Sequence, residues 1–223
     1  MPTLPPSKFF PPAETVDREG LVGFGGQLTE EWLLDAYSHG IFPWPMGEPG
    51  TPVPWWSPDP RAVIELDRFH VPRRLRRTIR SGRFEVTRDR DFPGVIGGCA
   101  TASDRAGETW ITPEMADAYT QLHRRGHAHS VEAWHEGRLV GGVYGVAIGG
   151  LFAAESMFYR VRDASKVALV RLVEHLRARG YAVFDIQQLT PHLARFGATT
   201  IPRREYLRRL AAAVRLPVMF DEP

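Results

Sequence analysis

Two polar side chains stand two positions apart near the end of a predicted strand and could take part in catalysis. Because side chains alternate across a strand, Asp185 and Gln187 should point to the same side. A carboxylate is costly to bury on an apolar strand unless it has a partner. Asp185 and Gln187 are therefore a candidate catalytic pair. A satisfied internal hydrogen bond at the end of the strand explains them equally well.

A second carboxylate is expected to approach this pair. Glu155 and Met157 should share one face of another predicted strand. A helical crossover would return the chain beside that strand and bring Glu155 near Asp185. Two carboxylates beside an apolar wall could hold an amine and take its proton. The structural alternative is a carboxylate held in an ion pair by Arg160 or Lys166.

Tryptophans in irregular segments indicate a nucleic-acid partner. Trp44, Trp55 and Trp56 fall in a Pro-rich stretch, and Trp110 follows a polar one. Aromatic rings of this kind stack on bases in proteins that bind single strands. Packing in the core or between domains is the alternative for each tryptophan.

Basic residues point to the same class of partner. Residues 61–90 hold ten arginines and four acidic residues, although the whole chain has a net charge of only +2. A helix predicted from Val71 to Ser81 places arginines on one face and Leu75 and Ile79 on the other. A solvated helix surface is the alternative. The arginines on this face are Arg73, Arg76, Arg77 and Arg80.

The predicted elements that position these residues are antiparallel strands followed by a crossover. Short turns join three strands into a meander, and a helix then leads to a strand parallel to the third. Asp163 should cap that helix and Gly180 should end it. The strands are His129 to Trp134, Arg138 to Ala147, Leu151 to Phe158 and Tyr181 to Gln187; the crossover helix is Ala164 to Arg179.

The rest of the chain is expected to be less regular toward its start. Residues 1–20 read as an extended Pro-rich arm, residues 20–26 as a Gly-rich bend, and residues 41–60 as a rigid aromatic loop. We expect a domain boundary near residue 60, with an N-terminal part over 1–60 and a catalytic part over 61–223. Further predicted elements are helices from Glu30 to His39, from Thr112 to Gly126 and from Pro202 to Val214, and a strand from Phe84 to Thr87.

Composition and missing motifs restrict the function. The chain has 223 residues, 43% of them hydrophobic, and no apolar run near the ~20 residues that cross a bilayer. A single cysteine, Cys99, argues against disulfides and a thiolate zinc site and fits the cytosol. The spacing of the histidines does not predict a metal site, and no serine-hydrolase or nucleotide-binding motif occurs. These histidines are His123, His127, His129 and His135.

Several motifs together resemble the leucyl/phenylalanyl-tRNA–protein transferases. The longest are Trp55-Trp56-Ser57-Pro58-Asp59-Pro60-Arg61 and Glu155-Ser156-Met157-Phe158. Others are Gly40-Ile41-Phe42-Pro43-Trp44, Thr109-Trp110-Ile111-Thr112, Asp185-x-Gln187 and Pro191-His192-Leu193-Ala194. The similarity runs in order over residues 9–210.

This resemblance implies an α+β protein with a small N-terminal domain and an acetyltransferase-like (GNAT) domain whose mixed sheet is largely antiparallel. It implies transfer of Leu, Phe and less well Met from aminoacyl-tRNA to proteins that begin with Arg or Lys. The modified proteins are thereby marked for degradation in the cytoplasm. The resemblance also implies that the transferase uses no cofactor or metal and has no membrane partner. Asp185 and Gln187 would be catalytic, and the basic helix face would bind tRNA.

The resemblance also implies roles for the remaining site residues. Glu155 would hold an amine, Trp44 and Trp110 would contact the terminal adenosine, and an apolar slot would take the amino-acid side chain. The slot residues would be Met157, Val143 and Leu172. Departures from the family pattern are Gln27, Ala154, Tyr159, Ile186 and Arg195.

Two other functions fit parts of the sequence. An acetyl-CoA-dependent acetyltransferase needs a Gly-rich turn for the pyrophosphate before a helix, and residues 157–165 lack it. A non-catalytic RNA-binding module explains the arginines and tryptophans. It does not explain why Glu155, Asp185 and Gln187 should converge.

Overall fold

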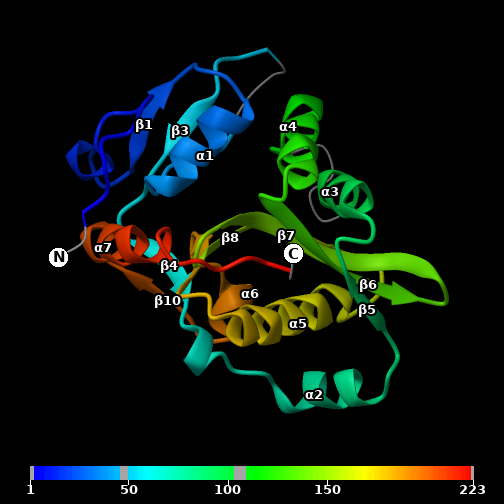
Figure 1. Ribbon diagram of the computed structural model, residues 1–223. Helices are drawn as coiled ribbons and strands as arrows, with labels where there is room; N and C mark the ends of the chain where they lie inside the picture. The colour runs from blue at the N-terminus through cyan, green and yellow to red at the C-terminus, as the bar shows by residue number, and fades with distance from the viewer. Residues whose placement is uncertain (1–2, 46–49, 103–108, 222–223) are drawn as a thin grey trace.

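The computed structural model describes residues 3–45, 50–102 and 109–221, which form two sheets (Figure 1). The first sheet has the antiparallel order β1-β3-β2. Its strands are β1 (Leu21–Phe24), β2 (Phe42–Pro43) and β3 (Pro54–Trp56), and the helical segments beside it are η1 (Ala13–Thr15) and α1 (Glu30–Ser38).

The second sheet has seven strands in the order β10-β4-β9-β8-β7-β6-β5. Only the β8–β9 pair is parallel, as the crossover predicted. The expected α+β fold with a mixed, largely antiparallel sheet is therefore confirmed. The strands are β4 (Arg61–Ile64), β5 (Glu85–Arg88), β6 (Ala128–His135), β7 (Arg138–Ile148), β8 (Leu151–Tyr159), β9 (Val183–Gln187) and β10 (Ala198–Ile201).

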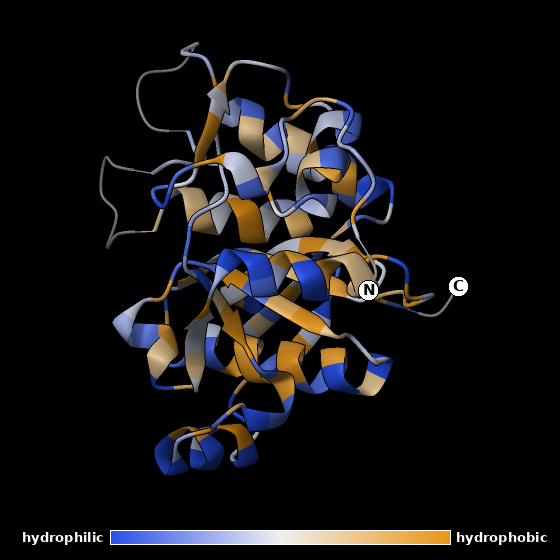
Figure 2. Ribbon diagram, turned by 90° about the vertical axis from the view of Figure 1, so that its left-hand side faces the viewer, coloured by the Kyte–Doolittle hydropathy of each residue, from blue (hydrophilic) through white to orange (hydrophobic). Residues whose placement is uncertain are grey.

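Helices cover both faces of this sheet. In Figure 1, α5 and α2 lie below it, while α1, α3 and α4 lie above it. Apolar residues gather on the strands and on the inner sides of the helices (Figure 2). The helices are α2 (Arg73–Arg80), α3 (Phe92–Ala100), α4 (Pro113–Arg124), α5 (Ala164–Arg179), α6 (Pro191–Ala194) and α7 (Arg203–Ala213), with a 3-10 turn η2 (Leu66–Arg68).

The sheet divides the apolar interior into two clusters. The upper cluster contains buried residues of α1, α3, α4 and α7, among them Tyr37 and Tyr119. The lower cluster is formed largely by α5 with the opposite face of the strands, and includes Phe184 and Ile186. No described helix combines the length and the apolar character that a bilayer crossing requires.

Local signals account for the ends of several helices. The Thr29 hydroxyl accepts a hydrogen bond from Trp32 N at the start of α1, and Gly40 follows that helix with φ +74°. Gly180 ends α5 with φ 81°. The predicted cap Asp163 is wrong, because its carboxylate accepts from Lys166 Nζ (2.8 Å) instead of a backbone N–H.

Two predictions for the N-terminal part are also wrong. The Gly-rich bend contains β1, and the Pro-rich loop of 41–60 supplies β2 and β3. The prolines stand where a missing N–H is tolerated: Pro43 lies in the edge strand β2, and Pro54 is the first residue of the central strand β3. The N-terminal arm has no core of its own but packs against α1, where Phe9 stacks on Trp32 with ring centroids 4.2 Å apart.

The helix α3 was not predicted, since its sequence contains three glycines that disfavour helix. Tertiary packing explains one of them. A Cβ on Gly98 would lie 2.6 Å from the ring of Phe158, so only glycine lets the helix approach β8 this closely. The Asp91 carboxylate caps the helix by accepting from Gly94 N (2.9 Å).

Candidate active site

The predicted carboxylate–amide pair lies at the carboxyl end of β9. Asp185 and Gln187 belong to one side of the strand, while Phe184 and Ile186 pack into the lower cluster on the other. Asp185 is completely buried, and Gln187 is 9% exposed. The shared side expected from strand alternation is confirmed.

Every hydrogen-bonding position of the Asp185 carboxylate is filled. Arg61 Nε donates to Oδ1 (2.9 Å) and Arg61 Nη2 to Oδ2 (2.6 Å), which is a bidentate ion pair. Gln187 N also donates to Oδ1 (2.9 Å), and the Tyr206 hydroxyl donates to Oδ2 (2.8 Å). An incoming amine could touch Asp185 only by displacing one of these donors.

Arg61 connects the two sheets at this point. Its guanidinium lies between the rings of Phe42 and Tyr206, 4.7 and 4.6 Å from their centroids. Its third nitrogen, Nη1, donates to the carbonyl of Gly40 (3.0 Å). No role for Arg61 was predicted from the sequence. Its place at the end of the Trp-Ser-Pro-Asp-Pro-Arg motif was the signal that could have found it.

Glu155 lies beside this pair, as predicted. Gln187 Nε2 donates to Glu155 Oε1 (2.9 Å), and the Tyr119 hydroxyl donates to Oε2 (3.3 Å). The hydroxyl of Tyr37 in turn hydrogen-bonds that of Tyr119. We call Asp185, Gln187 and Glu155, with Arg61, Tyr37, Tyr119 and Tyr206, the reactive centre.

Burial determines the charge state of Glu155. Removal from water raises the pKa of its carboxyl to about 8; the hydroxyl of Tyr37 opposes the rise, and the Asp185 carboxylate adds to it. Tyr119 and Arg61 also favour the ionised form. Burial likewise raises the pKa of both tyrosines above its ordinary value, so that they stay neutral donors.

The expectation that Glu155 and Met157 share a face is wrong. In the β7–β8 register, Ala154 pairs with Gly145 and Ser156 pairs with Tyr144, so Glu155 is an extra residue in a β-bulge. The bulge shifts the alternation by one position. Met157 therefore packs into the lower cluster, while Glu155 faces Tyr119 from the upper side.

The ion pairs suggested as a structural explanation of Glu155 do not form. Lys166 pairs with Asp163 at 2.8 Å, and the guanidinium of Arg160 lies over the ring of Phe158 at 5.6 Å. Within the described residues, the partners of the Glu155 carboxylate are therefore an amide and tyrosine hydroxyls, not a cation that would fix it in an ion pair.

The other site residues divide between the two clusters. Val143 and Leu172 are buried in the lower cluster, and Met157 is partly buried against it. Trp44 and Trp110 are partly buried against the upper cluster. The structure thus groups the predicted slot residues below the sheet and the two tryptophans above it.

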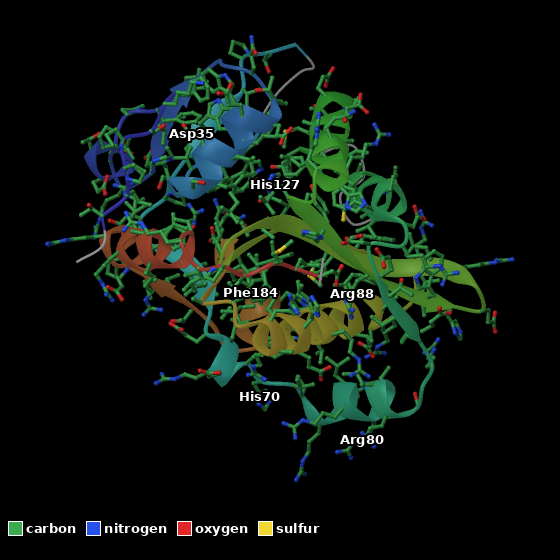
Figure 3. The ribbon with its side chains drawn as sticks, viewed as in Figure 1. Asp35, His70, Arg80, Arg88, His127 and Phe184 are labelled. Carbon is green, nitrogen blue, oxygen red and sulfur yellow. The ribbon has the colours of Figure 1, made fainter. Side chains whose placement is uncertain are left out.

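The predicted tRNA-binding helix lies apart from the reactive centre. The basic face of α2, which consists of Arg73, Arg76, Arg77 and Arg80, is exposed, whereas Leu75 is buried as expected. Figure 3 shows Arg80 at the end of the molecule opposite Asp35 of α1. The two surface cavities described, of about 410 and 300 Å³, are lined by other residues than the reactive carboxylates.

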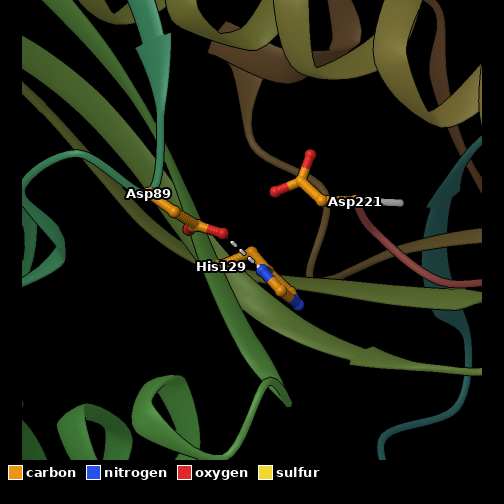
Figure 4. A group of neighbouring side chains, drawn as sticks. All are labelled: Asp89, His129 and Asp221. Atoms are coloured by element: carbon orange, nitrogen blue, oxygen red, sulfur yellow. Dashed lines mark hydrogen bonds and ion pairs between the residues drawn. The ribbon is translucent and has the colours of Figure 1, made fainter. Parts of the chain in front are cut away.

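His129 lies near two carboxylates, Asp89 and Asp221 (Figure 4), and His123 also lies 3.8 Å from the carboxylate of Asp89. His129 Nδ1 lies 2.6 Å from Asp89 Oδ2, and Nε2 lies 3.1 Å from the carbonyl of Gly126. Asp221 pairs with Arg88 at 3.3 Å. These contacts within the protein already engage both ring nitrogens.

Comparison with known proteins agrees with the resemblance in the sequence. The family model for leucyl/phenylalanyl-tRNA protein transferase matches residues 63–211, and the model for its N-terminal domain matches residues 26–59. The leucyl/phenylalanyl-tRNA–protein transferase of Nitratidesulfovibrio vulgaris (strain DP4) is 54% identical over 210 residues, which cover 93% of this chain and 88% of that protein. The one from Stutzerimonas stutzeri (strain A1501) is 52% identical over 214 residues, covering 95% and 94%.

A distant similarity to acetyltransferase structures is also found. An aminoglycoside acetyltransferase from an uncultured soil metagenomic sample has a TM-score of 0.40 and 18% identity, covering 51% of this chain and 88% of its own. This likeness carries no argument about activity. The two family models and the relatives above 50% identity show that this chain belongs to the leucyl/phenylalanyl-tRNA–protein transferase family.

Proposed function

We propose that this protein transfers leucine, phenylalanine and, less well, methionine from aminoacyl-tRNA to the N-terminal Arg or Lys of acceptor proteins. The product would be marked for degradation by its new N-terminus, and the reaction would take place in the cytoplasm. The observation that carries the proposal is the convergence of Gln187, Glu155 and the buried Asp185 at one point between the two sheets. A binding module has no need of this convergence.

The chemistry fits the groups present. An aminoacyl ester is already activated, so the transfer requires no further energy source. The α-amine of the acceptor has a pKa of about 7.7–8, so roughly a tenth of it or slightly more is neutral at pH 7. Holding the ester and the amine together supplies a large part of the rate enhancement.

Within the reactive centre, the Gln187 amide would orient the acceptor amine. Asp185 would act indirectly, by fixing the position of Gln187, because its Oδ1 holds the backbone N–H of Gln187 and its other positions are filled. Gln187 has φ 53°, a conformation that a residue other than glycine adopts rarely, and the Asp185 bond helps to fix it. The positioning of the amide thus depends on the buried ion pair.

Binding of the aminoacyl-tRNA would use the remaining residues. Val143, Met157 and Leu172 lie below the sheet, on the side opposite Glu155, so the amino-acid side chain would have to pass beside the β8 bulge to use them as an apolar slot. In such a slot one methylene changes binding by about 1–3 kcal/mol. Trp44 and Trp110 would stack on the terminal adenosine. The basic face of α2 would hold phosphates of the tRNA body at a distance from the reactive centre.

The test is a transfer assay with labelled leucyl-tRNA and two peptides that differ only in their first residue, Arg or Gly. We expect label on the Arg-led peptide and little on the Gly-led one. Leucyl-tRNA binding without transfer to either peptide would favour a binding module. Equal labelling of both peptides would contradict the proposed acceptor specificity.

A further inference from the structure

We propose that Glu155 takes the proton from the attacking amine, and that Tyr119 and Tyr37 are positioning residues that hold its carboxylate and set its proton affinity. This inference rests on the proposed function and assigns a step within it. The environment of the other carboxylate of the centre, Asp185, makes it unsuitable for the same task.

Asp185 is the less suitable proton acceptor because its charge is already neutralised. The carboxylate is fully buried in a bidentate pair with Arg61 and accepts two further hydrogen bonds, from Gln187 N and the Tyr206 hydroxyl. Protonating it would leave the Arg61 guanidinium, 1% exposed, without a counter-charge. Asp185 therefore holds the centre together and does not exchange protons during the reaction.

Glu155 has the opposite environment. Its partners are the amide of Gln187 and the hydroxyl of Tyr119, so that no cation is bonded to it in the described structure. Burial disfavours its ionised form and places its pKa near the operating pH, where a general base is most effective. The amide that would orient the amine is the same group that touches Glu155, so an amine held by Gln187 lies within reach of the carboxylate.

The two tyrosines reach Glu155 from the helices above the sheet. Tyr37 comes from α1 and Tyr119 from α4, and both rings are buried. Their linked hydroxyls donate toward the carboxylate and stabilise its ionised form. The ionisable groups that face Glu155 are Tyr37 of α1, Tyr119 of α4, Asp185 of β9 and Arg61 of β4, with Tyr206 of α7 behind Asp185 and Tyr144 of β7 against the ring of Tyr119.

The proton balance closes within this arrangement. The amine nitrogen attacks the ester carbonyl, a C–N bond forms, and the bond from the carbonyl carbon to the ribose oxygen breaks. The nitrogen loses one proton and the ribose oxygen gains one. Glu155 receives the proton from nitrogen and returns it to the ribose oxygen, so that the carboxylate is regenerated.

The test compares the pH dependence of transfer in Tyr119→Phe and wild type under single-turnover conditions with saturating leucyl-tRNA and an Arg-led peptide. Loss of one donor should raise the pKa of Glu155, move the midpoint of the rate profile up by about one pH unit and lower the rate at pH 7 about tenfold. The rate at high pH should return toward wild type. Tyr37→Phe should behave in the same way, while Glu155→Gln should lose about 100-fold or more at every pH.

Tyr181→Phe is the matched control. Tyr181 is also a buried tyrosine, and its hydroxyl has no hydrogen-bond partner among the described residues. It packs against Phe152 with its ring and lies away from Glu155. Its profile should match that of wild type. The ionisation of the peptide amine is common to all variants and cannot cause a difference between them.

A second measurement follows Glu155 without any transfer. ¹³C NMR of glutamate side-chain carboxyls, with Glu155→Gln to assign the signal, should give a midpoint near 8 in wild type and a higher one in Tyr119→Phe. An unmoved NMR midpoint, or a Tyr119→Phe rate that is lowered equally at every pH, overturns the inference. Absence of transfer by the wild type to any peptide instead overturns the proposed function.

Discussion

The reactive centre and the basic face of α2 use charged side chains in opposite ways. In the centre, Asp185 and Arg61 are buried and bind each other at 2.6 and 2.9 Å. On α2, the arginines are exposed, and no ion pair is described for any of the four. Charges of the first kind stabilise the protein, whereas charges of the second kind face solvent, where the proposed tRNA would meet them. Substitutions in the reactive centre should therefore change stability or transfer, whereas substitutions on α2 should change tRNA binding.

The largest expected effect is on stability. Arg61→Met leaves the Asp185 carboxylate buried without its counter-charge and should reduce the free energy of unfolding by about 3–5 kcal/mol. Arg77→Met, the same change on α2, should stay within about 0.5 kcal/mol of wild type. Urea unfolding measures both. If the two variants unfold at the same urea concentration, the buried Arg61–Asp185 pair does not stabilise the fold more than an exposed arginine does, and the contrast with α2 is wrong.

The next effect is on the reaction. Asp185→Ala removes the acceptor that holds the Gln187 backbone and should slow transfer by about 100-fold or more, while tRNA binding stays close to wild type. Because the variant also leaves the Arg61 guanidinium buried without a counter-charge, both quantities are measured on protein that circular dichroism shows to be folded. Asp185→Asn keeps the shape and serves as the control for packing. Single-turnover transfer and a filter-binding assay separate the two quantities. Normal turnover by Asp185→Ala would remove this residue from the mechanism.

The pH dependence of stability sharpens the contrast further. Burial raises the pKa of Glu155 to about 8 in the folded protein, so the folded state keeps a proton that the unfolded state has lost. The stability that this proton provides is fully present below the unfolded pKa and is lost as pH rises toward 8. Wild type should therefore lose stability relative to Glu155→Gln over this interval, measured by urea unfolding at several pH values. A constant difference between the two proteins would contradict the raised pKa.

The smallest effect concerns the surface. Reversing the charge of Arg76 and Arg77 to Glu should weaken tRNA binding without changing stability, and should reduce the slope of log K against log salt by about 2. Arg138→Glu, at an exposed position of the β6–β7 hairpin, is the control. An unchanged slope would reassign the basic face of α2 to ordinary solvated surface.

Much of the architecture could be predicted from local patterns. The strands β6, β7 and β8, the helix α5 and the parallel β9 follow from alternation, short turns and an apolar helical stripe. The joint location of Asp185, Gln187 and Glu155 followed from the same topology. Helix α3 and strands β1 to β3 did not, because glycines and prolines disfavour regular structure until tertiary contacts compensate for them.

The sequence by itself determined the motifs that identify the family, the basic face of α2 and the two polar positions on β9, because each depends on residues close together in the chain. Only the tertiary structure decided what those polar groups do. Arg61 meets Asp185 across 124 residues, and Tyr119 meets Glu155 across 36. A single bulged residue turns Glu155 away from Met157. The pKa of a carboxyl group depends on its exposure to water, on nearby charges and on hydrogen-bond donors. In this protein, distant segments that only folding brings together determine all three.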